Sequence, residues 1–188
     1  MANPAVKNTD TKVVTGKVRF SYAHVFEPYA HEQGQEEKYS VCLLIPKEDK
    51  RTLQSIKNAI EAAKVQGQAK WGGKVPPTLK LPLRDGDTER PDSPEYAGMY
   101  FLNASSKNPP GIVDRKLREI IDSSEFYSGC YGKASINFYP FSVSGNKGIA
   151  AGLNNLQKTD DGDYLGGRSR AEDDFEALEE EGEDDFLN

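Results

Sequence analysis

Apolar residues recur at every second position in several segments of this chain, a period that is typical of half-buried β-strands. The first of these segments places Val14, Val18 and Phe20 on one face and two cations on the other. The pattern predicts strands over residues 13–26, 38–45, 79–83, 98–104, 112–113 and 131–141, and a further apolar segment over 149–153.

The strand over residues 131–141 has the clearest alternation. Its apolar side chains (Ala134, Ile136 and Phe138) are expected to face a core. Single-stranded nucleic acid needs flat rings for its bases and cations for its phosphates. The opposite face of this strand offers that mixture, with Tyr131, Lys133, Asn137 and Tyr139. The pattern leaves open the alternative that a second layer covers this face and makes Tyr139 a core residue.

Residues 49–66 change to a period of three and four, with Leu53, Ile56 and Ile60 on one face. This spacing predicts one long amphipathic helix, which the glycines from Gly67 onward end. Residues 71–95 are rich in proline and glycine and are expected to form a long excursion. A loop of this length within a compact domain is usually functional or mobile.

Strands do not alternate with helices along the chain, which disfavours a doubly wound parallel sheet. We predict a mainly β fold, namely an OB-fold-like five-stranded antiparallel Greek-key barrel with one long amphipathic helix and long loops. The expected organisation is a flexible N-terminal arm (1–12), a nucleic-acid-binding domain (13–153), a flexible linker (154–170) and a disordered acidic tail (171–188).

Charge is distributed unevenly between the two ends of the chain. The 188 residues contain 24 Lys and Arg against 30 Asp and Glu, a formal net charge of −6. Ten of these carboxylates lie in residues 171–188, which contain no Lys or Arg, so residues 1–170 carry 24 − 20 = +4. A block of like charge does not bury enough apolar surface to fold. The sequence therefore predicts a mildly basic body followed by an anionic tail.

The tail ends in two carboxylates and two apolar residues that suit a docking peptide: Asp184, Asp185, Phe186 and Leu187. Such a segment can imitate a nucleic-acid backbone and occupy the protein's own basic groove, or it can recruit a partner protein. A tail that only improves solubility is the third interpretation.

The sequence offers no catalytic or metal-binding pattern. Cys42 and Cys130 are far apart, and only two histidines are present, which argues against a zinc site or a disulfide framework. Residues 145–148 lack the spacing of a phosphate-binding loop, and residues 160–163 lack that of an EF-hand. We expect no enzymatic activity, no cofactor and no metal.

The start of the chain lacks the apolar core of a signal peptide, and the apolar runs are too short to span a membrane. A cytoplasmic protein is therefore expected. A metal-dependent nuclease built on Asp85, Asp87 and Glu89 is a distant alternative, because these carboxylates share one loop rather than converging from rigid elements.

Cations and aromatic residues in several segments are candidates for DNA contacts. The densest cluster spans residues 115–118, which a solvated surface also explains. The candidate cations are Lys17, Arg19, Lys107, Arg115, Lys116, Arg118, Lys133 and Lys147. Tyr131 and Tyr139 are the main candidates for base stacking, with Trp71, Tyr100 and Phe141 as weaker ones.

Five blocks in the same order resemble a bacteriophage family of single-stranded-DNA-binding proteins, long described as a domain of unknown function. The blocks span residues 80–87, 96–107, 131–141, 145–157 and the pair 165–168 with 171–175. The resemblance implies an OB-fold, no enzymatic activity, and a role in phage DNA replication and recombination inside an infected bacterial host. It supplies no individual DNA-contacting residues.

Residues and resemblance together predict a protein that coats single-stranded DNA without sequence specificity. Its tail would compete with DNA and recruit replication or recombination proteins. The rival hypothesis is a protein-interaction adaptor, whose tail binds a partner and whose barrel does not bind nucleic acid. The sequence leaves the oligomeric state open and allows a homodimer.

Overall fold

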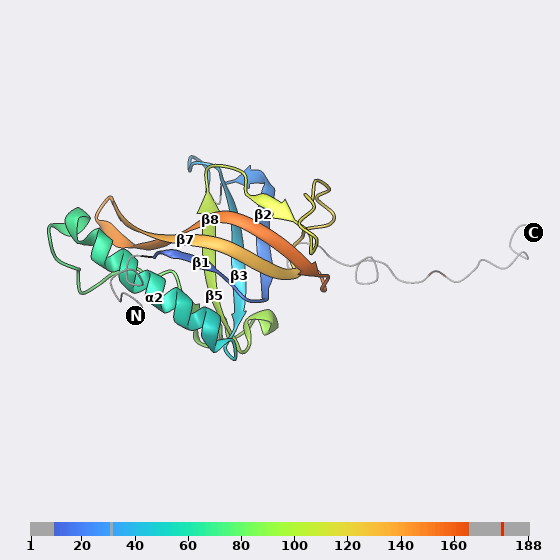
Figure 1. Cartoon of the computed structure of the whole chain (residues 1–188), viewed down its shortest axis with the longest axis horizontal. Helices are drawn as coiled ribbons and strands as arrows, with labels where there is room; N and C mark the ends of the chain where they lie inside the picture. Colours follow the sequence, from blue (N-terminus) through green and yellow to red (C-terminus); the bar gives the residue numbers. More distant parts are fainter. Residues whose placement is uncertain (1–9, 31, 166–177, 179–188) are drawn as a thin grey trace, which may run out of the picture.

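A computed structural model describes residues 10–30, 32–165 and 178 of the chain. Figure 1 shows a curved β-structure with one long helix along its side. The helices are α2 (Lys50–Gly67) and α3 (Gly86–Glu89), with two 3₁₀ turns at Gln68–Trp71 and Pro94–Tyr96. The strands are β1 (Lys12–Val14), β2 (Val18–Tyr29), β3 (Lys38–Pro46), β4 (Arg84–Asp85), β5 (Met99–Ser106), β6 (Gly111–Val113), β7 (Tyr131–Val143) and β8 (Asn146–Asp160).

Five strands close into a ring in the order β2-β3-β5-β8-β7, with β7 returning to β2. This closed five-stranded arrangement is that of an OB-fold, so the predicted fold class is confirmed. Two details differ from the prediction. The short strands β1, β4 and β6 extend the ring, so the described part of the chain has more than five strands. In addition, β5 and β8 pair in parallel, whereas an antiparallel barrel was predicted.

The alternation predicted from residue 13 onward is wrong in its first part, because the chain bends between β1 and β2. Val13 is buried and pairs with Ile136 of β7, whereas Val14 points to solvent. The phase holds for Val18 and Phe20, which are buried, and shifts again at an irregularity in the β2–β3 pairing beyond Ser21. Because of the irregular connection between β1 and β2, the buried side chain of β1 is Val13 rather than the predicted Val14.

The long helix forms as its apolar spacing predicts. The Asp49 carboxylate caps its first turn by accepting from the Thr52 N–H at 3.1 Å. Leu53, Ile56 and Ile60 are buried in the barrel core. The helix lies along β7 and β1 (Figure 1) and covers the face of β7 that carries its apolar side chains. Its position leaves the opposite face of β7 uncovered by α2.

The predicted end of the folded domain at residue 153 is too early. Strand β8 continues to Asp160, paired with β7 and, further on, with β6, so residues 154–160 are part of the sheet rather than a linker. The predicted strand over residues 79–83 is also wrong, since only Lys80 forms an isolated bridge there. The tail, 171–188, lies almost wholly outside the described residues, as does most of the predicted N-terminal arm.

Gly132 allows β7 and β8 to approach at an irregularity in their register. A Cβ atom at this position would overlap the carbonyl oxygen of Gln157. We expect Gly132→Ala to lower the free energy of unfolding by about 1–3 kcal/mol, because the backbones must separate. A thermal melt followed by circular dichroism measures this.

Gly152→Ala is the matched control for this test. Gly152 lies on β8, the strand paired with β7, and its added Cβ would meet its nearest neighbour, the Asn137 carbonyl oxygen, at an ordinary 3.4 Å. Its melting temperature should stay close to that of the wild type. Equal melting temperatures for the two variants would contradict the close approach at Gly132.

Candidate nucleic-acid interface

Three predicted DNA-binding residues meet where β2 joins β7 and closes the barrel. Arg19 pairs with Tyr131 across this seam. The guanidinium carbon of Arg19 lies 5.3 Å from the centre of the Tyr131 ring, and the Lys17 ammonium lies 5.2 Å from it. Arg19 also donates to the carbonyl oxygens of Gly129 and Asp163. The seam therefore places two cations against one aromatic ring.

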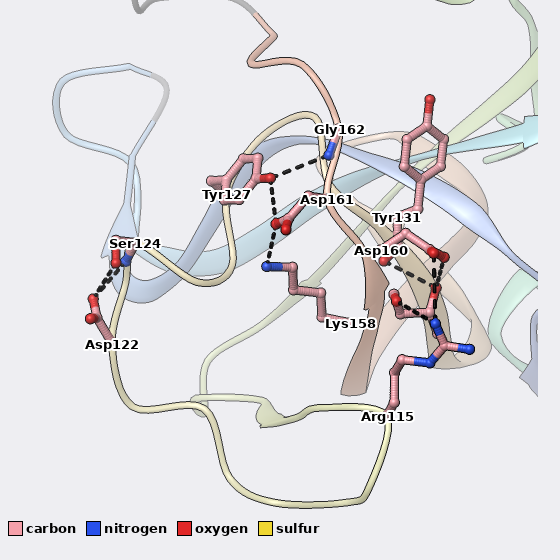
Figure 2. Close-up of polar contacts among 10 residues, drawn as sticks. Arg115, Asp122, Ser124, Tyr127, Tyr131, Lys158, Asp160, Asp161 and Gly162 are labelled. Carbon is pink, nitrogen blue, oxygen red and sulfur yellow. Dashed lines mark hydrogen bonds and ion pairs between the residues drawn. The ribbon is translucent and has the colours of Figure 1, made fainter.

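Asp160 at the end of β8 links this cluster to the loop that follows β6. Its carboxylate lies 2.9 Å from the Lys17 ammonium. It also lies 3.8 Å from the guanidinium of Arg115, which Figure 2 shows reaching toward Asp160. Lys17 is the main reason that the pKa of Asp160 is below its ordinary value. Lys17, Arg19, Tyr131 and Arg115, which the sequence offered as separate candidates, thus lie in one group together with the Asp160 carboxylate.

The outer face of β7 continues from this group. Lys133 and Tyr139 are exposed, and the apolar residues between them are buried, so the predicted alternation is confirmed. Tyr139 retains 39% exposure, which argues against the alternative of a core residue. Asn137 accepts from the Thr11 hydroxyl at 2.9 Å. Tyr139 lies eight positions after Tyr131, which corresponds to about 27 Å along a strand.

The other predicted residues are dispersed, and Trp71 is wrong as a stacking candidate. Trp71 is only 6% exposed, and its indole N–H donates to the Phe141 carbonyl oxygen at 3.1 Å. This contact ties the end of the helix to the β7–β8 hairpin, which also carries Lys147. Lys107 lies elsewhere and pairs with Glu36 at 3.3 Å.

Tyr100 on β5 packs against the core and lies beneath the Lys47 ammonium, 5.2 Å from its ring centre. Neither Tyr100 nor Trp71 therefore joins the group at the seam. Lys116 and Arg118 do lie near it, because their turn is tied to β8 through the Gln157 amide, which donates to the Asp114 carbonyl oxygen.

An OB-fold usually binds oligonucleotides on the face of its second and third barrel strands, here β3 and β5. One end of that face is covered in this protein. Leu44 and Phe101 pack outside the barrel against Tyr96, which directly follows the proline-rich segment predicted as an excursion over residues 71–95. Arg84 and Arg90 of the same segment lie over the Phe101 ring, at 5.1 and 5.5 Å.

Lys47 at the end of β3 anchors this covering segment. Its ammonium lies 2.8 Å from the Asp85 carboxylate and 2.7 Å from that of Asp87. Asp87 also accepts from the Gly98 N–H at 3.0 Å, and Glu89 pairs with Arg84. The three carboxylates of the alternative metal centre, Asp85, Asp87 and Glu89, are thus paired with cations. Among the described residues, no group of three or more potential metal ligands is present.

The second half of β2 supplies aromatic residues that the sequence analysis missed. Tyr22 and Tyr29 are exposed, and Tyr29 stacks on His24 with ring centres 4.2 Å apart. Tyr29 also lines a hollow of about 310 Å³ with Lys38 and Ser40 at the uncovered end of the β3 face. The even spacing of Phe20 and Tyr22 placed Tyr22 with the core residues, and the irregular pairing of β2 with β3 beyond Ser21 breaks that spacing before Tyr29.

The chain leaves the barrel beside the same face. Residues 161–165 follow β8, and the N–H of Leu165 donates to the Ser128 carbonyl oxygen. The Leu165 side chain packs against the outer cluster that contains Leu44 and Phe101. Tyr127 donates to Asp161 at 2.7 Å, as Figure 2 shows, and burial raises the pKa of Tyr127 to about 12. The last described residues before the tail, 161–165, therefore lie beside the candidate interface.

Comparison with known proteins identifies the family. The family model for the single-stranded-DNA-binding protein of Enterobacter phage Enc34 matches residues 11–187. The chain belongs to this family. A relative called putative protein p50, from Acyrthosiphon pisum secondary endosymbiont phage 1, is 32% identical over 187 residues, covering 94% of this chain and 98% of that protein.

Solved structures are similar over most of the chain. The single-stranded DNA-binding protein from bacteriophage Enc34, in complex with single-stranded DNA, has a TM-score of 0.73 at 31% identity, covering 83% of this chain and 90% of that one. The single-stranded DNA-binding protein gp2.5 of bacteriophage T7 has a TM-score of 0.60 at 17% identity, covering 88% and 94%. The second likeness concerns the fold alone.

Membership of this family confirms the expectation of a phage-type binding protein rather than an enzyme. Within the ranges that the structure describes, no helix is both long and apolar enough to cross a membrane.

The Lys47 anchor gives the covering segment a defined pH dependence. Because Lys47 donates to both carboxylates, the pKa values of Asp85 and Asp87 lie below their ordinary 3.8, and the pKa of Lys47 lies above its ordinary 10.5. The stability that these contacts provide is fully present from pH 3.8 to pH 10.5, between the ordinary pKa values of the carboxyl groups and the lysine. It is lost as pH falls through the lowered carboxyl pKa values, or rises through the raised lysine pKa.

We expect Asp87→Asn to increase amide hydrogen exchange of residues 84–98 at pH 7, and the difference from the wild type to shrink as the pH falls below 3.8. The exposed Asp92 lies in the same segment, and Asp92→Asn should exchange as the wild type does. A variant difference that persists unchanged at acid pH would contradict an anchor made by ionised carboxylates.

Proposed function

We propose that this chain binds single-stranded DNA without sequence specificity, along the β2–β7 seam and the outer face of β7. The observation that carries the proposal is the contact of Lys17 and Arg19 with the Tyr131 ring, on an OB barrel of this family. Cations beside an aromatic ring suit single-stranded DNA, because the cations can bind its phosphates while the ring stacks on its bases.

The open face of β7 extends this surface. Lys133 and Tyr139 follow Tyr131 on the same side of the strand, so a cation and a second ring lie further along it. Every base has a face that stacks on an aromatic ring, so such a surface tolerates any sequence. The hollow beside Tyr29 and Lys38 offers a second approach on the uncovered end of the β3 face.

The acidic tail is proposed to compete with DNA for these cations and, when displaced, to recruit replication or recombination proteins in the host cytoplasm. The place where the chain leaves the barrel supports this, since Arg19 holds the Asp163 carbonyl oxygen at 2.7 Å. The ten carboxylates of residues 171–188 follow on a body of +4. Asp184, Asp185, Phe186 and Leu187 are the proposed docking residues for partners.

A fluorescence-anisotropy titration of labelled oligo-dT tests the proposal. The full chain should bind, and a 1–170 truncation should bind more tightly, most of all at low salt, where charges are least screened. Every strand and helix of the described residues ends by Asp160, so the truncation keeps all of them. Equal affinities at low salt would contradict competition by the tail, and the absence of binding in both forms would favour the adaptor hypothesis.

The salt dependence identifies the phosphate contacts. Lys133→Gln should weaken binding and reduce the slope of log K against log salt by about 0.7, the value for one phosphate contact on a single strand. Lys57 is exposed on α2, away from the proposed surface, and Lys57→Gln serves as the control. A slope for Lys133→Gln that equals the control would remove the outer face of β7 from the interface.

A further inference from the structure

A rigid turn after β6 presents an apolar residue among cations. The Asp114 carboxylate accepts from the backbone N–H groups of Lys116 at 2.8 Å and Arg118 at 3.0 Å, and from the Arg118 side chain at 3.2 Å. Backbone hydrogen bonds also join Asp114 to Arg118 and to Leu117. The conformation of this turn is therefore fixed by one acidic residue.

Leu117 is an unusual residue for the position that this turn gives it. Its φ is +64°, in the left-handed region that favours glycine and asparagine. Its side chain is 72% exposed, so burial does not compensate for the unfavourable backbone. Ile121, at the end of the same hairpin, is 80% exposed. Stability alone would favour glycine or asparagine at position 117, which points to a use for the leucine side chain.

The surroundings of Leu117 indicate what it contacts. Arg115, Lys116 and Arg118 are exposed around it, and Asp114 and Glu119 are the carboxylates of the same segment, which leaves an excess of positive charge. The Arg115 guanidinium donates to the Thr159 carbonyl oxygen at 3.3 Å and reaches Asp160, which also holds Lys17. The turn therefore adjoins the cation cluster at the β2–β7 seam.

We propose that Leu117 packs against a base of the bound single strand, while the cations beside it contact the flanking phosphates. The turn would then form a second DNA contact outside the barrel faces. An apolar tip surrounded by cations complements a polymer that has apolar base faces and an anionic backbone. The inference rests on the proposed function, whose failure would appear as the absence of DNA binding by the wild type.

The left-handed backbone allows substitutions that remove the side chain without harming the fold. Leu117→Asn and Leu117→Gly both suit a φ of +64°. We expect their melting temperatures to equal or exceed that of the wild type. In the full chain, their affinity for a dT oligomer should fall about fivefold, through loss of an apolar contact. Val65→Gln, which replaces an exposed aliphatic residue on α2, should bind as the wild type does.

The salt dependence separates the two kinds of contact at this turn. Leu117→Asn should leave the slope of log K against log salt unchanged, because no phosphate contact is lost. Lys116→Gln should lower that slope by about 0.7. A Leu117→Asn variant with wild-type affinity would overturn the proposal. So would a loss of affinity that is explained entirely by a smaller slope of log K against log salt, because that would be the loss of a phosphate contact.

Two further outcomes assign the turn to a different occupant and overturn the proposal. If Leu117→Asn changes the affinity of the full chain but not that of the 1–170 truncation, Leu117 contacts the acidic tail rather than DNA. If it abolishes association between copies in sedimentation velocity while DNA affinity stays constant, the tip is a protein interface. Equal losses of DNA affinity in both chain lengths support the base contact.

Discussion

The barrel depends on a short seam between β2 and β7, which closes the ring of five strands. Two register pairs form it, Val18 with Gly132 and Arg19 with Tyr131. The Phe20 N–H also donates to the Cys130 carbonyl oxygen at 2.9 Å. Gly132 takes part in this seam, and on its other side the missing side chain lets β7 approach the Gln157 carbonyl oxygen of β8. The same closure brings Arg19 to Tyr131, so the stability of the seam and the geometry of the candidate interface share one cause.

The seam also places the competing groups together. Arg19 donates to the Asp163 carbonyl oxygen in the segment that leads into the tail, while its guanidinium lies over the Tyr131 ring. Lys17 is shared in the same way between the Asp160 carboxylate and Tyr131. A phosphate that approaches these cations must therefore compete with an acceptor of the protein itself, the Asp163 carbonyl oxygen on Arg19 or the Asp160 carboxylate on Lys17. Such surface pairs are individually weak, and an anionic polymer with many charges displaces them readily.

The elements that could be predicted from the sequence are those whose regularly spaced apolar residues pack into the core. The helix and the buried face of β7 both followed from this spacing, because each keeps one face against the same apolar cluster. The end of β8 was missed, since Asn154, Asn155 and Gln157 give that strand a polar composition although it is paired on both sides. Trp71 was misplaced because its glycine-rich surroundings indicate a loop, whereas the end of the helix buries it. The covering segment over Phe101 has no period at all.

That covering segment explains why the candidate interface differs from the usual face of an OB-fold. Leu44 and Phe101 would form a flat apolar surface on β3 and β5, but Tyr96 packs on them and Lys47 fixes the segment in place. A DNA strand gains nothing from rings that are already buried. Exposed rings lie instead on β7, at Tyr139, and on its sheet neighbour β2, at Tyr22 and Tyr29. The apolar layer that covers one face thus leaves β7 and β2 open, which is why the proposed interface lies there, where Tyr131 already has its cations.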